Sequence, residues 1–539
     1  MKRIIAVFLF MALSLPLAAQ SYRSDIKSQA GEKWYGVYTA KAFNGTPLEK
    51  IHFQPYPADY TAKDLRIDNN SNQAAPLLLS NMGRYIWSDD PFVFELQNGD
   101  VIIRSDTEQV AAIEAGSTLR DAYIAAMQAH FPPQGKTPDP LMFRMPQYNT
   151  WIELNYNQNQ ADVLRYADAI IENGFPVGVF MIDDQWTRYY GDLDFDSGKF
   201  PNPKAMVDEL HAKGFKVMVW VSPFVSSDTP EYRELRAKKA LVMRLDGKGP
   251  ALVRWWNGYS ACIDFTKSEA VKWYQSKLDH LQAAYGIDGF KFDAADFDFY
   301  TAGSPVFPNE NTTTTGPVQA ELYAQFGVQY PFNEFRASWK NCNLAVAQRL
   351  QDKAYSWDDM QLLIPDMVSA GLIGHHFTCP DMIGGGLLGT FDDDKFDGEM
   401  MVRSAQIQAL MPMMQFSVAP WRVLDAEHLA LCRAAAQLHA ALGDEIYAMA
   451  CEAARTGEPI IRHLEYAFPH EGFESCNDMY MFGDKYLVAP MTTSGQSRTI
   501  MLPKGRWRDE KGKIYKGGRT YTVDVPLSRL PYFERVGKN

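Results

Sequence analysis

The architecture of this chain is most directly inferred from one segment, Gly286-Ile287-Asp288-Gly289-Phe290-Lys291-Phe292-Asp293-Ala294-Ala295-Asp296. Its apolar, β-compatible residues predict a buried strand that ends in carboxylates. Side chains alternate along a strand, so Lys291 and Asp293 are expected on the same face. An ammonium group beside a carboxylate favours the ionised form, which suits a nucleophile. Because an isolated Lys-x-Asp is more simply a structural ion pair, the function must be argued from the rest of the chain.

Predicted strands and helices alternate around this segment over roughly 320 residues. The strands are predicted at 177–183, 215–221, 286–293, 344–348, 372–377, 409–416 and 459–466, and the helices at 161–173, 203–213, 268–285, 359–370, 400–408 and 426–441. Such alternation indicates an α/β fold of the (β/α)8 barrel type. A doubly wound sheet is the alternative, but no glycine-rich phosphate loop follows any predicted strand.

Charged residues favour the barrel, because they fall at or just past the C-terminal ends of predicted strands. They are Asp183, Asp184, Asp293, Arg349, Asp352 and Asp381. The C-terminal rim is where barrel enzymes carry their active sites. We therefore expect these side chains to meet in one site.

Four regions are predicted along the chain. Residues 1–20 combine Lys2-Arg3, an apolar run and Ala18-Ala19, as in a secretory signal peptide. Residues 21–138 are expected to form an N-terminal β-sandwich, 139–470 the catalytic barrel and 471–539 a C-terminal β-sandwich. The protein is thus expected to be exported, to the periplasm or beyond the cell, and no later segment has the length of a membrane span.

Composition excludes several classes of function. The net charge of −12 argues against a nucleic acid or an anionic membrane surface as partner. Six widely spaced cysteines predict neither a disulfide scaffold nor a zinc site. Asp293, Asp296 and Asp298 are spaced for a metal, but Lys291 beside them argues against one, and no cofactor is expected. The oligomeric state is not indicated.

Carboxylates and aromatic residues on one rim suggest glycoside hydrolysis, which uses one ionised carboxylate and one carboxylic acid. Asp293 is the expected nucleophile and Asp352 the preferred acid. A non-catalytic sugar-binding protein is the alternative from another class, although such a protein needs neither residue.

Several signatures together make the chain resemble glycoside hydrolase family 31 along nearly all of its length after residue 20. They are residues 195–203 (FDSGKFPNP), Trp220 with Pro223, residues 255–258 (WWNG), residues 380–385 (PDMIGG) and residues 483–490 (GDKYLVAP). The resemblance implies an oligosaccharide or glycoside substrate. Lys291, two residues before Asp293, and Asp352-Lys353 resemble the branch that holds bacterial α-galactosidases and the myogenesis-regulating glycosidase.

The resemblance also implies residue roles. Asp293 occupies the position of the nucleophile, and Asp352 that of the acid/base in the divergent branch. In ordinary α-glucosidases of the family the acid/base follows a tryptophan, which would point to Asp358 or Asp359 after Trp357. A histidine that contacts sugar in many members is replaced by Ser417.

The expected function is therefore a retaining α-glycosidase, preferentially an α-galactosidase; α-glucosidase, α-xylosidase and sulfoquinovosidase are the alternatives. Asp183 or Asp184 is expected to bind a sugar hydroxyl, only one of the two facing the site. The other expected substrate-binding residues are Trp87, Trp220, Trp256, Lys291, Arg349 and Asp381, although Asp381 suits a turn-stabilising role equally well.

Overall fold

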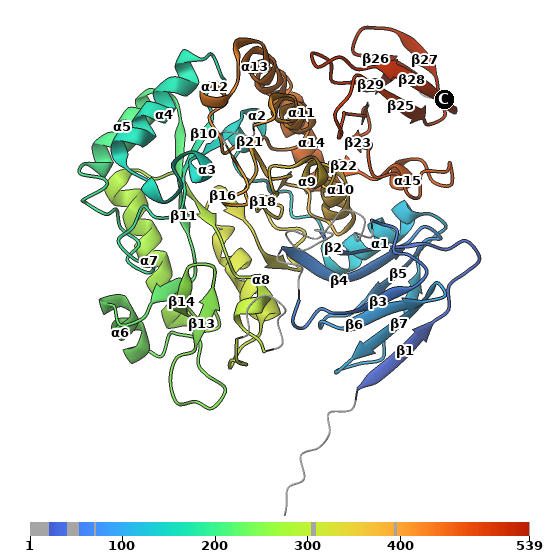
Figure 1. The fold of residues 1–539 in the computed structure, drawn as a ribbon. Helices are drawn as coiled ribbons and strands as arrows, with labels where there is room; N and C mark the ends of the chain where they lie inside the picture. The colour runs from blue at the N-terminus through green and yellow to red at the C-terminus, as the bar shows by residue number, and fades with distance from the viewer. Residues whose placement is uncertain (1–20, 40–52, 69–71, 303–308, 393–395, 538–539) are drawn as a thin grey trace, which may run out of the picture.

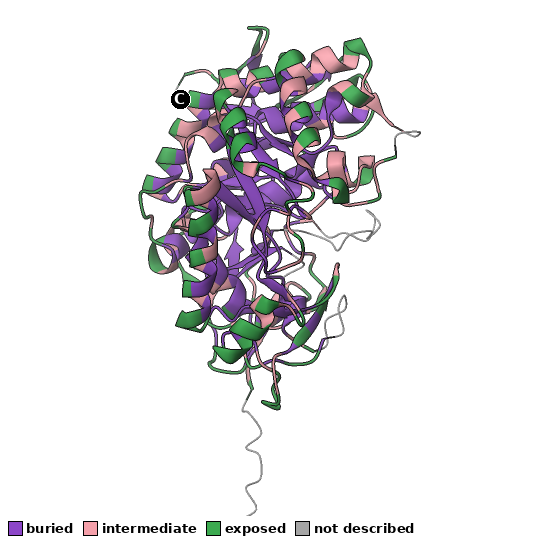
Figure 2. Cartoon of the chain, turned by 90° about the vertical axis from the view of Figure 1, so that its left-hand side faces the viewer, coloured by how far each residue is buried: buried purple, intermediate pink, exposed green. Residues whose placement is uncertain are grey.

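A computed structural model describes residues 21–39, 53–68, 72–302, 309–392 and 396–537. The expected signal peptide, residues 1–20, lies outside the described residues. Figure 1 shows a central helix-bearing domain with N-terminal strands at one side and C-terminal strands above them. Figure 2 shows buried strands at the centre of the molecule, with helices around them that expose their outer faces.

The central domain is a closed parallel barrel. Its strands hydrogen-bond in the order β19-β18-β16-β15-β11-β10-β9-β21-β20. The two ends of this path, β19 (Thr378–Cys379) and β20 (Met382–Ile383), are halves of one strand position interrupted by Pro380 and Asp381. Because β19 pairs with β18 and β20 pairs with β21, the sheet closes there into eight strand positions. The predicted (β/α)8 barrel is confirmed.

Several elements lie where the sequence predicts them. The opening segment forms β15 (Gly289–Phe292), between β11 (Lys216–Val221) and β16 (Phe332–Phe335), and β10 (Val179–Ile182) follows α4 (Gln160–Glu172). Helices α5 (Pro203–Ala212), α7 (Ser268–Tyr285), α11 (Gly398–Ala409) and α13 (Ala426–Ala441) also match the prediction. The expected helix at 359–370 is two helices, α9 (Trp357–Met360) and α10 (Leu363–Leu372).

Other strand predictions are wrong in extent or place. The strands at 344–348 and 409–416 are reduced to β18 (Gln348–Arg349) and β21 (Gln415–Phe416). The strand predicted at 372–377 is misplaced, because this segment lies between the end of α10 and the start of β19. The segment 459–466 contributes β22 (Ile461–Arg462), which pairs with β23 (Tyr480–Phe482) of the C-terminal sheet and not with the barrel.

Two barrel strands are not predicted from the sequence, because buried polar residues interrupt their hydrophobic pattern. In β9 (Gln147–Asn149) and β16, Gln147 and Glu334 are fully buried. The Gln415 amide donates to both, at 3.0 Å to Gln147 Oε1 and 2.6 Å to Glu334 Oε2. A polar layer therefore crosses the barrel interior, where apolar side chains are the usual filling.

Two sheets make up the N-terminal region. One pairs β1 (Tyr22–Ile26), β7 (Asp100–Ser105), β6 (Val93–Gln97) and β3 (Tyr60–Asp64). The other contains β2 (Trp34–Tyr38), β4 (Gln73–Ser80), β5 (Arg84–Trp87) and β8 (Ala112–Glu114). Helix α1 (Leu119–His130) follows.

A segment of the barrel domain completes the second N-terminal sheet. β17 (Ser338–Trp339), from the connection between β16 and β18, pairs in parallel with β4 through Ser338↔Gln73 and Trp339↔Ala74. Trp339 and Phe297 are buried in the hydrophobic core of the N-terminal region. The two domains therefore share a sheet and a core.

The C-terminal region contains two sheets. The larger joins β22 and β23 to β24 (Tyr486–Val488), β29 (Tyr532–Arg535), β26 (Arg506–Asp509) and β27 (Ile514–Lys516). The smaller pairs β25 (Ser497–Leu502) with β28 (Arg519–Asp524). Arg403 of α11 is fully buried and donates to the Val525 carbonyl at 2.8 Å, which ties this region to the barrel.

We predict that Gly289→Ala destabilises the barrel. A Cβ at Gly289 would lie 1.9 Å from the Phe332 carbonyl oxygen on the neighbouring strand, so the β15–β16 pair would have to shift. Overpacking of this kind costs about 1–3 kcal/mol, measurable by urea unfolding. Gly249→Ala is the control, since a Cβ there meets no heavy atom within 4 Å. Equal unfolding midpoints for both variants would contradict the prediction.

Candidate active site

A cavity of about 350 Å³ opens among the residues that follow the barrel strands. It is lined by Trp151, Tyr156, Asp183, Asp184, Trp220, Trp256, Lys291, Asp293, Asp296, Asp298, Arg336, Arg349, Asp352, Met382, Gly386, Leu387 and Leu388. Eight of the ten residues predicted for the site are among them. A cavity of this size suits one sugar ring and part of a second group.

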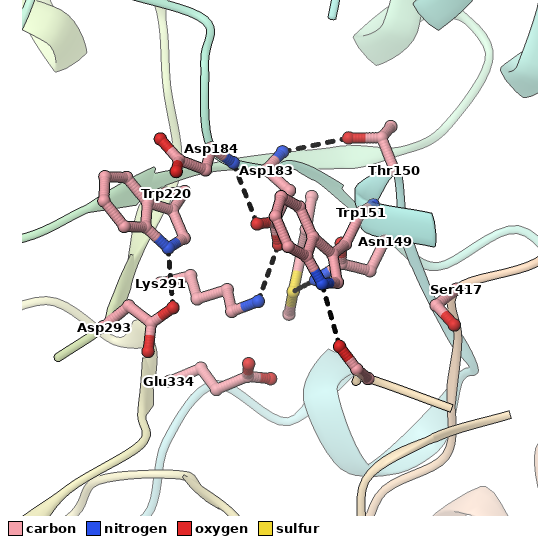
Figure 3. Close-up of polar contacts among 12 residues, drawn as sticks. Asn149, Thr150, Trp151, Asp183, Asp184, Trp220, Lys291, Asp293, Glu334 and Ser417 are labelled. Atoms are coloured by element: carbon pink, nitrogen blue, oxygen red, sulfur yellow. Dashed lines mark hydrogen bonds and ion pairs between the residues drawn. The ribbon is translucent and has the colours of Figure 1, made fainter. Parts of the chain in front are cut away.

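Lys291 forms an ion pair with Asp183 (Figure 3), and both residues line the cavity. Its ammonium nitrogen lies 2.6 Å from Asp183 Oδ2, and both side chains are buried. Burial alone would lower the pKa of Lys291, but the Asp183 carboxylate outweighs it, so the pKa is raised and the ammonium stays charged. Lys291 and Asp293 share the cavity as expected, but the direct ion-pair partner of Lys291 is Asp183, and Asp293 acts on the ammonium at longer range.

The Asp293 carboxylate is held by neutral N–H donors. The Trp220 indole donates to Oδ2 at 2.7 Å (Figure 3). The Ala294 backbone amide donates to Oδ1 at 2.9 Å. The chain turns sharply after Asp293, because Ala294 and Ala295 have φ of 65° and 68°. These left-handed conformations are uncommon outside glycine and point to a constrained turn. The turn aims a carboxylate, already oriented by two hydrogen bonds, at the cavity.

Both Asp183 and Asp184 line the cavity, contrary to the expectation that only one would. Strand β10 ends at Ile182, so the alternation of a pleated strand does not apply to them. Asp184 Oδ2 accepts hydrogen bonds from the Tyr190 hydroxyl and the Asn257 amide, both at 3.0 Å. Burial and the neighbouring Asp183 raise the pKa of Asp184 to about 7.

Two guanidinium groups clamp the Asp352 carboxylate. Arg349 approaches Oδ1 at 2.5 Å, and Arg336 approaches Oδ2 at 3.0 Å. Burial alone would raise the pKa of Asp352, but Arg349 and Arg336 together hold it well below its usual range. Arg336 also reaches Asp296 at 3.2 Å and lies over the Trp256 ring.

Asp381 stands behind this clamp and does not line the cavity. Its side chain is fully buried, accepts the Lys353 amide at 2.6 Å and lies 3.1 Å from Arg349. Its backbone has a φ of 143°, rare for a residue other than glycine. Burial raises the pKa of Asp381 despite Arg349. Asp381 therefore supports the barrel seam, the turn-stabilising alternative considered for it.

Residues 141–449 match the glycosyl hydrolases family 31 TIM-barrel domain, and residues 457–538 match the glycosyl hydrolase family 31 C-terminal domain. The chain belongs to glycosyl hydrolase family 31. It is therefore a member of a family of glycosidases, whose substrates are oligosaccharides and related glycosides.

Among its family 31 relatives, the myogenesis-regulating glycosidase of Mus musculus is 33% identical over 432 residues, covering 78% of this chain and 60% of the mouse protein. Alpha-glucosidase 2 of Bacillus thermoamyloliquefaciens is 26% identical over 431 residues, or 73% and 53% of the two chains. The chain thus spans little more than half the length of these relatives. A Flavobacterium johnsoniae dextranase structure with bound glucose superposes with a TM-score of 0.83 at 21% identity, covering 96% of this chain and 66% of that one, which supports the fold.

Two residues considered from the family pattern lie away from the cavity. Trp87 stacks on His130 of α1, with ring centroids 4.2 Å apart, so it does not reach the site as expected. Ser417, at the position of the family's sugar-contacting histidine, donates to the Gly385 carbonyl at 2.6 Å and is fully buried.

Several cavity residues of this family 31 protein were not singled out from the sequence. They are Trp151, Tyr156, Arg336, Met382, Gly386, Leu387 and Leu388. Arg336 directly follows β16, a strand that the hydrophobic pattern did not reveal. Correct placement of that strand would have put Arg336 on the catalytic rim.

No cluster of three or more histidine, cysteine, aspartate or glutamate side chains in the described part of the chain is arranged to hold a metal ion. No helix within those same ranges has the length and apolarity needed to cross a bilayer.

We predict that binding of a neutral sugar such as galactose strengthens as pH rises through the pKa of Asp184, about 7. An ionised carboxylate accepts a sugar hydroxyl better than a carboxylic acid does. The ionised fraction rises from about a tenth to about nine tenths between pH 6 and 8, so the affinity should rise by up to about tenfold.

Isothermal titration calorimetry across this pH range measures the effect. In Asp184→Asn the pH dependence should disappear, since an amide does not titrate there. A wild-type affinity that falls with pH, or an equal slope in the variant, would contradict the assignment.

Proposed function

We propose that this family 31 member is an exported retaining α-glycosidase, periplasmic or secreted, that removes terminal α-linked sugars and prefers α-galactosides. Asp293 acts as nucleophile and Asp352 as acid/base. The observation that carries the proposal is the presence of these two carboxylates on one sugar-sized cavity, each held by a different kind of donor.

The proposed reaction has two displacement steps. In the first, Asp352 gives its proton to the glycosidic oxygen while Asp293 attacks the anomeric carbon, so the leaving alcohol departs and a glycosyl ester forms on Asp293. In the second, Asp352 takes a proton from water, which attacks the same carbon and releases the sugar with retained configuration. Retention requires the two carboxyl groups to lie roughly 5–5.5 Å apart.

The clamp on Asp352 has to loosen for the first step. Two guanidinium groups favour its ionised form, whereas a general acid must carry a proton. Arg336 is the more movable of the two, because Asp296 and the face of Trp256 can retain it when it leaves Asp352. Arg349 is fixed by Glu334 and Asp381 as well as Asp352.

The preference for α-galactosides is inferred from Lys291 and Asp183. One ammonium hydrogen is used by Asp183, the hydrogen-bond partner of Lys291 within the described residues. An ammonium group has three donors, so two can reach adjacent sugar hydroxyls. This donor–acceptor pair in the lining of the cavity can distinguish the configuration at C4. Family relatives named as alpha-glucosidase and alpha-xylosidase make those specificities the alternatives.

We predict that p-nitrophenyl α-galactoside is hydrolysed with a higher kcat/KM than the corresponding α-glucoside and α-xyloside. Asp293→Ala should abolish turnover of each, because no other carboxylate would form the glycosyl ester. A preference for glucoside or xyloside would overturn the specificity and leave the mechanism. Sugar binding without turnover of any glycoside would favour a binding protein.

We further predict that the loss of kcat/KM in the Asp352→Asn variant depends on the leaving group of the substrate. Glycosides of poor leaving groups should lose about 10²–10⁴-fold in kcat/KM, because general acid catalysis is removed. Glycosyl fluorides, whose leaving group needs little protonation, should lose much less. Asp359→Asn is the matched control, since the Asp359 side chain accepts the Ala354 amide at the start of α9 and lies outside the cavity. Equal losses on both substrate classes would refute Asp352 as the acid.

A further inference from the structure

We propose that Gln73, in the N-terminal β domain, is a positioning residue for the reaction in the barrel. Its carboxamide ties the backbones of Arg336 and Arg349 together and so sets the spacing of the two guanidinium groups on Asp352. The inference rests on the proposed acid/base role of Asp352 and adds to it a residue from another domain.

The contacts of Gln73 support this role directly. Its side-chain nitrogen donates to the Arg336 carbonyl and, at 3.1 Å, to the Arg349 carbonyl. The residue is fully buried, and its Oε1 accepts the Thr39 hydroxyl at 3.4 Å. Both amide hydrogens are thereby used on the two residues whose side chains hold Asp352.

The position of Gln73 is itself fixed by the shared sheet. Gln73 lies opposite Ser338 in the β4–β17 pair, and the Lys340 amide donates to the Ala74 carbonyl at 2.9 Å. On the barrel side, the Arg336 amide lies 3.4 Å from the carbonyl of Phe292, the residue before Asp293. The segment that carries Arg336 therefore joins the N-terminal sheet to the strand that carries the nucleophile.

Loss of the carboxamide would act on the site through these backbones. The buried Arg349 carbonyl and the half-buried Arg336 carbonyl would each lose a donor, which costs free energy unless the chain moves to find another. Any movement shifts both arginines relative to Asp352. The strength of the two ion pairs on Asp352 depends steeply on the distances between the guanidinium groups and the carboxylate. Proton transfer by Asp352 should therefore change more than substrate binding.

Gln73→Met tests the proposal, because methionine is similar in length and lacks the amide donors. Gln54→Met is the matched control: Gln54 is a buried glutamine of the same domain that donates to the Gly36 carbonyl at 2.8 Å. Both variants lose a buried amide–carbonyl bond, but only Gln73→Met touches the barrel. Their melting temperatures show whether they are equally destabilised.

We expect Gln73→Met to lose about tenfold or more in kcat/KM on an α-glycoside with a poor leaving group, because Asp352, although more readily protonated, is no longer held in line with the glycosidic oxygen. On the glycosyl fluoride the loss should be about threefold or less. The basic limb of its pH profile of kcat/KM should move to higher pH by about half a unit or more. Weaker ion pairs with Arg336 and Arg349 favour the protonated form of Asp352. Gln54→Met should match wild type in both. Equal losses on the two substrates, with an unmoved basic limb, would overturn the proposal and leave Gln73 a merely structural residue.

Hydrogen exchange separates failure of this inference from failure of the proposed function. Peptides that cover residues 336–352 should exchange faster in Gln73→Met than in wild type or Gln54→Met, whether or not the protein cleaves any glycoside. Unchanged exchange overturns the tie between Gln73 and these backbones. A lack of leaving-group dependence in Asp352→Asn instead overturns the acid role. If Gln73→Met does not fold, Gln73→Asn, one methylene shorter, is measured in the same way.

Discussion

The buried guanidinium of Arg349 holds together the parts of this barrel that bear on catalysis. It lies 3.3 Å from Glu334, 2.5 Å from Asp352 and 3.1 Å from Asp381, carboxylates that come from three successive strand positions. A buried cation is tolerable only when several anions compensate its lost hydration. Glu334 in turn accepts the Gln415 amide, so the charge cluster continues into the polar layer that crosses the barrel.

This arrangement places the seam of the barrel next to the site. β19 and β20 are separated by Pro380, which has no amide hydrogen to donate, and by Asp381 in its strained conformation. The Asp381 carboxylate offsets that strain by holding Arg349 and the Lys353 amide. The interruption of the strand thus supplies the buried anion that keeps Arg349, and through it Asp352, in place.

Apolar strands and amphipathic helices could be predicted from the sequence, and so could the rim on which the carboxylates meet. Lys291, Asp293 and Asp352 could be predicted because each lies within or shortly after a segment with a recognisable strand pattern. Strands β9 and β16 could not be found in this way, because Gln147 and Glu334 point into a polar interior. The partner of Lys291 was likewise hidden, since Asp183 lies 108 positions away in the chain.

The parallel pairing of β17 with β4 has a consequence for the order in which the protein is made. Domains generally fold as units from the N-terminus during synthesis, so the edge of β4 can be present before Ser338 and Trp339 leave the ribosome. That edge then acts as a template on which the connection after the fifth barrel strand is laid down. A barrel produced without residues 21–130 would lack its template, and the N-terminal domain would act as an intramolecular folding aid for the catalytic rim.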